Sequence, residues 1–316
     1  LYYDHWCANT LDTELFWGPA LTTQFVEQIP PLDDQTRWLD EVWCEGAAII
    51  DHDRKFLGWY GGEDLMYDVP ARRAFLALME HQWTGWQVRW LCAGIVDLGQ
   101  YLGLSIDQFR SAAAPERRRP LQVLADPDNN ETLLTVRLGA EKSAARIWGN
   151  IQSLQIGAAQ LPTLLVIPRL ASLIWTGEMP RFGIHFDLDE RAVYYWSARP
   201  QEFAAEQVEA AWPGWRAHWL QDDFDEQLRI ADLDISLPIR GPVDLQRDQI
   251  ERLRRWHYHA SHNPARENLG VVSNILAAKI TDLNPMTDIA RGSVGSEVQK
   301  LQVLDNLLTT IRGPEV

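Results

Sequence analysis

The sequence predicts an α/β (α+β) fold made of two diverged copies of one hairpin-helix-strand unit with pseudo-two-fold symmetry, plus a helical C-terminal segment. Three observations lead to this prediction: a turn sequence that recurs once, a tryptophan-rich strand that recurs in the same order, and helical patterning after Pro242. Because both recurrences keep their order, duplication explains them better than coincidence. We expect a first repeat unit, a linker, a second repeat unit and the helical segment over residues 1–110, 111–131, 132–241 and 242–316.

The first element of each unit is a hairpin. The segment 51–55 (DHDRK) recurs as 187–191 (DLDER), and apolar runs flank both. Two apolar runs around a short turn rich in aspartate are typical of a β-hairpin. Asp51 and Asp53 are therefore expected to stabilise the turn, as are their counterparts Asp187 and Asp189.

A helix and a tryptophan-rich strand follow each hairpin. Pro70 opens the first helix and Pro200 the second, and apolar residues follow both at helical spacing. The segments 83–91 (WTGWQVRWL) and 212–220 (WPGWRAHWL) alternate apolar and polar residues after their glycine, which is the period of a half-buried strand. We expect their tryptophans to lie in the core, and a weaker match of 18–20 to 157–159 predicts a short helix before each hairpin.

The first unit contains a segment that the second lacks. Residues 61–69 (GGEDLMYDV) lie between the first hairpin and its helix, and the second unit has fewer residues at this place. Because the second unit forms without such a segment, the fold does not require it. A specialised role is therefore one interpretation, and neutral variation of a loop is the other.

Aromatic residues and carboxylates are combined around this segment. Tryptophan and tyrosine are common in binding hot spots, and carboxylates attract Arg and Lys. We expect a surface that binds a partner presenting basic groups beside apolar ones, formed by Trp59, Tyr60, Glu63, Asp64, Tyr67 and Asp68. For Asp68, capping of the following helix is the alternative.

Composition excludes several classes of protein. A length of 316 residues, 46% hydrophobic and 23% charged, is that of a folded protein with room for two domains. The net charge of −15 opposes binding to nucleic acid and favours a basic protein partner. No apolar run is long enough to span a membrane, and the N-terminus lacks a signal-peptide pattern. We therefore expect a cytoplasmic protein that binds neither nucleic acid nor membrane.

Local signatures of catalysis and of cofactors are absent from the sequence. The three cysteines have no CxxC spacing, and there is no GxSxG, P-loop, GxGxxG or HExxH motif. We expect no cofactor and do not predict an enzyme on this ground. The weak metal candidates are His259 and His262, which a helix would place on one side, and Asp51 and Asp53. For the histidines, an exposed or interfacial position is the favoured interpretation.

These observations support three functional hypotheses. The leading one is an acidic, non-catalytic protein-interaction module of bacterial type, such as an immunity or antitoxin-like factor that binds a basic partner. The alternative is a metal-dependent hydrolase or transferase with a carboxylate-rich site between the two repeats, using Asp51, Asp53, Glu63 and Asp64. The third is a structural subunit that forms a homo-oligomer through its C-terminal helices.

Overall fold

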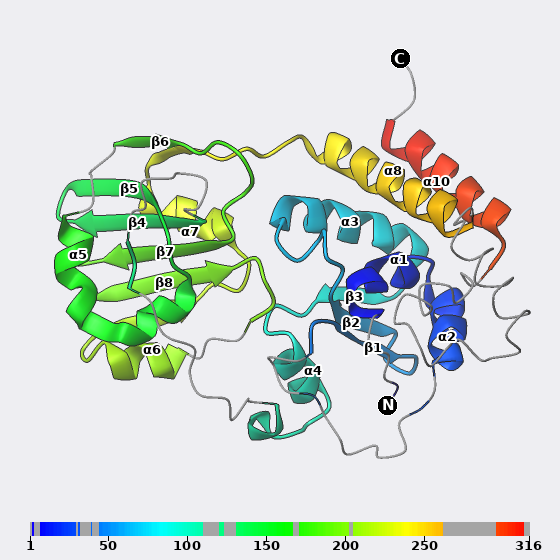
Figure 1. Cartoon of the computed structure of the whole chain (residues 1–316), viewed down its shortest axis with the longest axis horizontal. Coiled ribbons are helices and arrows are strands. Elements are labelled where there is room, and N and C mark those ends of the chain that lie inside the picture. The colour runs from blue at the N-terminus through cyan, green and yellow to red at the C-terminus, as the bar shows by residue number, and fades with distance from the viewer. Residues whose placement is uncertain are drawn as a thin grey trace, which may run out of the picture. The chain divides into compact units, whose positions relative to one another are not determined.

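The computed structural model has a mixed α+β fold that forms two compact units (Figure 1). Unit 1 comprises Leu1–Leu65, Pro70–Trp90 and Arg240–Val316, and unit 2 comprises Met66–Val69 and Leu91–Ile239. The structure describes residues 2, 7–29, 31, 39, 44–109, 120–122, 131–166, 171–201, 205–261 and 295–312. Unit 1 thus contains the first hairpin and the described helices of the C-terminal segment.

Unit 1 combines a three-stranded sheet with helices from both ends of the chain. Strand β2 lies between β1, which is antiparallel to it, and β3, which is parallel to it. The elements are η1 (Cys7–Thr10), α1 (Leu11–Leu15), α2 (Pro19–Gln28), β1 (Ala47–Asp51), β2 (Phe56–Tyr60), α3 (Val69–Gln82), β3 (Gln87–Trp90), α8 (Pro242–Ser261) and α10 (Glu297–Arg312).

Unit 2 is built on a five-stranded mixed sheet of order β5-β4-β7-β8-β9. Strand β4 is parallel to β7, and a separate parallel pair joins β10 to β6. The elements are α4 (Ile95–Tyr101), η2 (Ile106–Gln108), β4 (Thr132–Leu138), β5 (Glu141–Ile147), η4 (Ile151–Gln160), α5 (Leu161–Leu165), β6 (Ser172–Ile174), β7 (Phe182–Asp187), β8 (Ala192–Ser197), α6 (Ala205–Ala211), β9 (Arg216–Trp219), α7 (Phe224–Ala231) and β10 (Asp234–Ser236).

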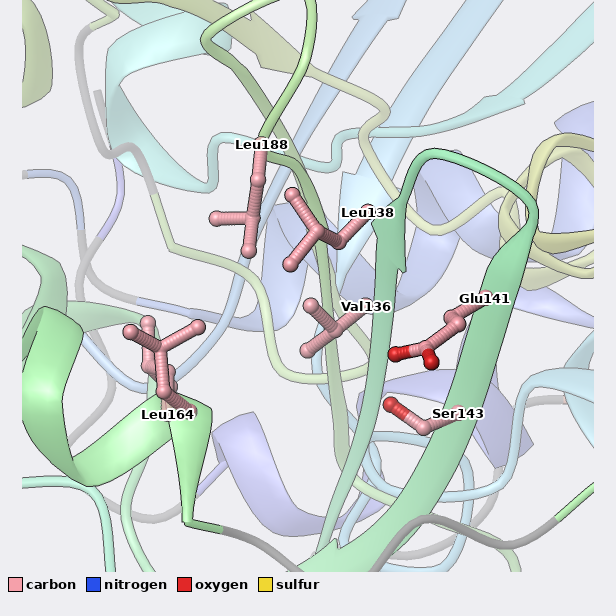
Figure 2. A pocket seen from close by; sticks show the side chains of 7 residues that line it. Val136, Leu138, Glu141, Ser143, Leu164 and Leu188 are labelled. Atoms are coloured by element: carbon pink, nitrogen blue, oxygen red, sulfur yellow. The ribbon is translucent and has the colours of Figure 1, made fainter.

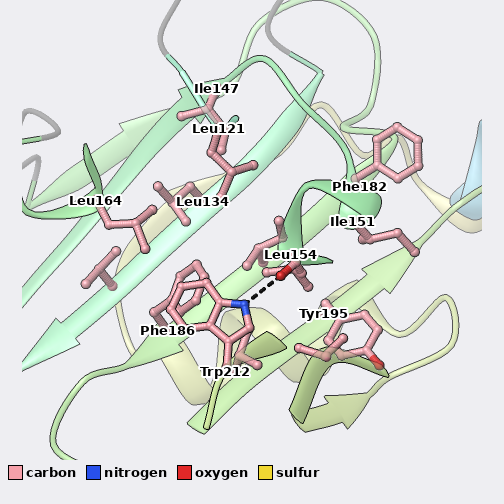
Figure 3. Packing of buried hydrophobic residues seen from close by; sticks show 14 of the residues in the cluster. Leu121, Leu134, Ile147, Ile151, Leu154, Leu164, Phe182, Phe186, Tyr195 and Trp212 are labelled. Carbon is pink, nitrogen blue, oxygen red and sulfur yellow. Dashed lines mark hydrogen bonds between the residues drawn. The ribbon is translucent and has the colours of Figure 1, made fainter. Parts of the chain in front are cut away.

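One face of the larger sheet carries the main core of unit 2 (Figure 3). Successive residues of a strand point to opposite faces, so alternate residues of β4, β7 and β8 gather here, among them Leu134, Ile184 and Tyr195. The indole of Trp212 closes this core and donates a hydrogen bond from Nε1 to the backbone oxygen of Leu154 at 2.7 Å (Figure 3). The bond satisfies the only polar group of a fully buried tryptophan.

The opposite face of this sheet is covered by α7 and is more polar. Gln227 of α7 accepts a hydrogen bond from Nε1 of Trp196 at 2.5 Å and donates to the backbone oxygens of Leu133 and Ile184. Gly183 makes room for this contact, because a Cβ at that position would lie 1.9 Å from the Trp196 nitrogen. Helix α7 is therefore held to the sheet by a buried amide.

The two predicted hairpin-helix-strand segments have the same order and the same pairing. Strands β7, β8 and β9 repeat the antiparallel and parallel senses of β1, β2 and β3, with α6 in the place of α3. Lys55 and Arg191 both end their turns with a φ of 50°. Trp83 donates its Nε1 hydrogen to the oxygen of Leu15 at 2.9 Å, as Trp212 does in unit 2.

The helical C-terminal segment buries apolar stripes from both of its described helices. Ile250 and Leu253 of α8 are fully buried, as are Leu304 and most of Leu307 of α10. Part of the segment for which we predicted helical patterning after Pro242, residues 262–294, lies outside the described residues. No helix in the described part of the chain is long and apolar enough to cross a membrane.

Candidate functional site

The segment that is specific to the first hairpin forms a fixed loop at the end of β2. Gly61 and Gly62 have φ values of 130° and 81°, a region that favours glycine. The backbone nitrogens of Gly62 and Glu63 donate to the oxygens of Ala8 and Asn9 at 2.8 and 3.2 Å. These bonds tie the loop to the N-terminal 3-10 helix η1.

The next residues anchor the other end of the same loop. Leu65 is fully buried, and its nitrogen donates to the oxygen of Gly62 at 3.1 Å. Arg72 of α3, also fully buried, donates from Nη1 to the oxygen of Leu65 at 2.9 Å. Between these two anchors, Glu63 and Asp64 are exposed. The two carboxylates are therefore presented by a backbone that is held on both sides.

A buried ion pair lies under this loop. Arg252 of α8 approaches Asp12 of α1, with 2.6 Å between Nη1 and Oδ2, and Asp12 is only 1% exposed. A Cβ on Gly62 would lie 2.7 Å from Oδ1 of Asp12, so the glycine allows the loop to cross closely. Asp64 is 3.9 Å from the same guanidinium and has a side chain that is 70% exposed. The loop thus covers the pair, and Asp64 reaches its edge.

Burial dominates the electrostatics of this region. It raises the pKa of Asp12 above its usual value, although the Arg252 guanidinium opposes the shift. Burial also lowers the pKa of His257, on α8, to about 4 and that of Lys300, on α10, to about 8. Trp17 contacts both groups. Its ring centroid lies 4.8 Å from the ring centroid of His257 and 4.8 Å from Nζ of Lys300. These groups join α8 and α10 to the N-terminal helices.

The structure divides the six residues of the expected binding surface. Trp59 and Tyr60 are buried in β2 at 0% and 2% exposure, and the Tyr60 hydroxyl donates to the oxygen of Cys44. Neither offers its ring to a partner in this conformation. Tyr67 and Asp68 belong to unit 2, where the Arg181 guanidinium lies 4.6 Å from the centre of the Tyr67 ring. Glu63 and Asp64 are the exposed members within unit 1.

Asp51 and Asp187 each accept a hydrogen bond within their own hairpin, whereas Asp189 accepts one from Gly139, outside its hairpin. Asp51 accepts a hydrogen bond from the Arg54 nitrogen at 2.9 Å, and Asp187 accepts the equivalent bond from Glu190 at 3.0 Å. Asp51 pairs with Phe56 at the start of β2, and Glu63 follows the end of the strand at Tyr60; at about 3.3 Å per residue, the strand between these ends spans roughly 13 Å. The four carboxylates of the enzyme hypothesis are therefore not gathered at one point of unit 1.

No family model, curated protein or solved structure matches this chain.

The histidine and metal hypotheses find no support in the described residues. His259 lies in α8 without a described side chain, and His262 lies outside the described residues. Among the residues with described positions, no group of three or more His, Cys, Asp or Glu could hold a metal ion. The cluster around Asp12 and Arg252 was not predicted, because no local pattern connects two residues from opposite ends of a chain.

A second candidate is a shallow apolar hollow in unit 2 (Figure 2). Val136, Leu138, Leu164 and Leu188 line it, and the side chains of Glu141 and Ser143 extend toward it from β5. The neighbouring Val166 is 78% exposed and Leu165 is 47% exposed. The hollow continues the core surface between β4 and α5 and holds one carboxylate, so it offers apolar contact but little chemistry.

Proposed function

We propose that this protein is an acidic, non-catalytic protein-interaction module of the immunity or antitoxin-like type, which binds a basic partner protein through Glu63 and Asp64. The observation that carries the proposal is that both carboxylates are exposed on a loop whose backbone is tied to η1 and to Arg72. A loop already held in one conformation loses little entropy on binding. An ordered acidic loop is therefore a suitable contact for Arg or Lys.

The charge of the whole chain supports the same proposal. A net charge of −15 attracts a basic surface at long range and speeds its association. The proposal places the protein in the cytoplasm, where such a factor would neutralise its partner. A homo-oligomer through α8 and α10 is a further proposal, supported by Val298 and Leu301, which are 73% and 39% exposed on α10.

We also propose that the two hairpin-helix-strand segments are diverged copies with pseudo-two-fold symmetry. The matching turn bonds of Asp51 and Asp187 and the matching indole bonds of Trp83 and Trp212 support this. On this proposal the loop with Glu63 and Asp64 is an addition to a shared scaffold. An addition that carries exposed charge on fixed backbone is more readily explained by binding than by folding.

A capture experiment with a matched control tests the proposal. The native host's proteins are passed over immobilised wild type, Glu63→Ala/Asp64→Ala and Glu27→Ala/Glu80→Ala. The control removes two exposed carboxylates from helices α2 and α3 of the same unit, so its net charge is identical. We expect a basic protein, retained in stoichiometric amount, to be lost from the loop variant and kept by the control.

Titration calorimetry with the purified partner then gives the affinities. Loss of two charge contacts should weaken binding about tenfold or more, and the difference should shrink with added salt. Equal affinity of all three proteins would contradict the role of the loop. If no stoichiometric partner is retained, the hydrolase or transferase alternative is favoured. The length of β2, which separates Asp51 from Glu63, counts against that alternative.

A further inference from the structure

The two hairpins differ in what lies beside their first strand. In unit 2, the outer edge of β7 is paired by β4, which runs parallel to it from Thr132↔Phe182 to Arg137↔Asp187. In unit 1, β1 is the edge strand of its sheet, and in the described part of the chain no strand pairs with its outer side. Among the residues that the structure describes, the strand that corresponds to β7 therefore has an edge without a partner strand.

We propose that the outer edge of β1 binds an extended segment of the partner protein, which adds a strand parallel to β1 as β4 does to β7. This inference rests on the proposed function and deepens it, because it names the element of the partner that is recognised. Addition of a strand to an exposed sheet edge is a general mode of peptide recognition. Main-chain hydrogen bonds then supply affinity, and side chains supply selectivity.

The sequence of β1 leaves its edge available for pairing. Protected edge strands usually carry lysine or proline, which hinder the addition of another strand. Strand β1 (AAIID) has neither, and all five of its residues are half-buried. Ile49 and Ile50 would contribute apolar contacts to the faces of the extended sheet.

The aspartates at the end of β1 predict that the bound segment carries a positive charge. In unit 2, Asp187 forms an ion pair with Arg137 of β4, and Asp189 accepts a hydrogen bond at 2.6 Å from the backbone nitrogen of Gly139, in the turn after β4. Asp51 and Asp53 occupy the same two places in the first hairpin. We therefore expect the bound segment to carry Arg or Lys opposite Asp51.

Asp53 gives an independent reason to expect a ligand at this edge. Its counterpart Asp189 closes the turn after the neighbouring strand. Asp53 is exposed, and the structure gives it no bonding partner among the described residues. The carboxylate is thus placed where the turn after an added strand would present a backbone nitrogen.

The strand that fills the corresponding edge in unit 2 supplies the probe. A labelled peptide with the sequence of residues 131–139 (ETLLTVRLG) is titrated into the full-length protein, beside a scrambled peptide. We expect saturable binding of the first peptide alone, and slower deuterium exchange of those amides of 47–51 that point away from β2 when it is bound. Asp51→Asn keeps the turn bond through its amide oxygen, so this variant should fold and bind the peptide about threefold more weakly.

Two further peptides test whether the contact is a strand pairing. One carries N-methyl groups on Leu133, Thr135 and Arg137, and the other on Leu134, Val136 and Leu138. Alternate amides of a strand point to opposite sides, so one peptide should lose binding and the other should retain it within about twofold. Equal binding of both would overturn the proposal, as would slowed exchange outside 47–51.

Other occupants of the edge would give different results. If a segment of this chain covers β1, the amides of 47–51 that point away from β2 are already slow to exchange in the unbound protein. If a second copy covers it, their exchange slows as protein concentration rises. Either result overturns the proposal. A captured partner that depends on Glu63 and Asp64 but leaves 47–51 unprotected would overturn this inference alone, and failure to capture a partner would leave the peptide result to decide it.

Discussion

At the scale of single residues, the hydrogen bonds under α7 determine which nitrogen of His185 carries the proton. The Gln227 amide nitrogen can only donate, and it lies 3.0 Å from the Thr135 hydroxyl oxygen. The Thr135 hydroxyl proton is then available for Nδ1 of His185, at 2.9 Å. If Nδ1 carried the proton instead, the buried Thr135 hydroxyl would have no described acceptor for its own proton, in addition to the unpartnered Nε2 of His185. This arrangement favours a neutral ring with its proton on Nε2, an atom that has no hydrogen-bond partner among the described residues.

This arrangement predicts that acid destabilises the protein through His185. Burial lowers its pKa from 6.5 to about 4, with Asp187 opposing and Arg137 reinforcing the shift. Between pH 6.5 and pH 4 this histidine binds a proton in the unfolded chain but not in the folded one, so the free energy of unfolding falls as pH decreases. A shift of this size corresponds to about 3 kcal/mol. Most of this loss falls between pH 7 and pH 4.5, and urea unfolding at these two pH values measures it.

A variant at the same position isolates this contribution. His185→Asn retains an oxygen that accepts from Thr135 but does not titrate, so its loss of stability on acidification should be smaller. His257 also has a pKa lowered to about 4 by burial, and it accounts for part of the remaining pH dependence. Identical pH dependence of wild type and His185→Asn would show that this ring is not buried in its neutral form.

At the scale of elements, the two tryptophans that follow the helices should have matching roles. Trp83 and Trp212 are both fully buried, and each donates its indole hydrogen to a backbone oxygen. Replacement by phenylalanine keeps most of the ring and removes the indole hydrogen bond to that oxygen, and in unit 1 the Leu15 oxygen still accepts from the Thr22 hydroxyl at 3.4 Å. We expect Trp83→Phe and Trp212→Phe each to lower the free energy of unfolding by about 1–3 kcal/mol.

The neighbouring tryptophans provide the control for this comparison. Trp86 and Trp215 pack against Trp83 and Trp212 with ring centroids 5.0 and 5.1 Å apart, but both are partly exposed. Phenylalanine at these positions should cost less than at the buried ones in chemical denaturation. A large effect of Trp83→Phe beside a negligible one of Trp212→Phe would show that the two segments are not built alike.

Elements whose signals are local could be predicted from the sequence. The hairpins, helix α3 and the strands β3 and β9 follow from turn residues, an opening proline and alternation. Helix α6 was also predicted, but its described part begins at Ala205, and Pro200, which we expected to open it, is not helical. The short strands β6 and β10 have three residues each and depend on pairing with each other, so no local pattern indicates them. The same limit applies to Asp189, whose bond to Gly139 depends on β4 lying beside β7.

The expected binding surface was partly misplaced for a related reason. Strand β2 (FLGWY) is apolar throughout and lies between two other strands, so all five of its residues are buried. A continuous apolar run is typical of a strand covered on both faces, and this pattern was available in the sequence. Trp59 and Tyr60 belong to that strand. Glu63 and Asp64 follow the strand's end, where the chain returns to the surface of unit 1.

At the scale of the molecule, the pair of Asp12 and Arg252 joins the beginning of the described chain to α8. Removing one partner of a buried pair leaves the other as an uncompensated charge, which costs about 3–5 kcal/mol. Arg252→Met should therefore destabilise the protein by this amount at pH 7. Methionine can still pack on Phe75, whose ring centre is 5.2 Å from the guanidinium, so the loss reflects the missing charge and not missing contacts. The double variant Asp12→Asn/Arg252→Met should recover most of the loss, since it removes both charges.

The pH dependence of this loss gives a second test of the same pair. Burial already raises the pKa of Asp12, and loss of the guanidinium should raise it further. The folded variant would then bind a proton more readily than the unfolded chain does, so acid should stabilise it relative to wild type. We expect the difference in unfolding free energy between wild type and Arg252→Met to be smaller at pH 5 than at pH 7. An equal difference at both values, or a double variant no more stable than Arg252→Met, would show that Asp12 is not held as a buried carboxylate by α8.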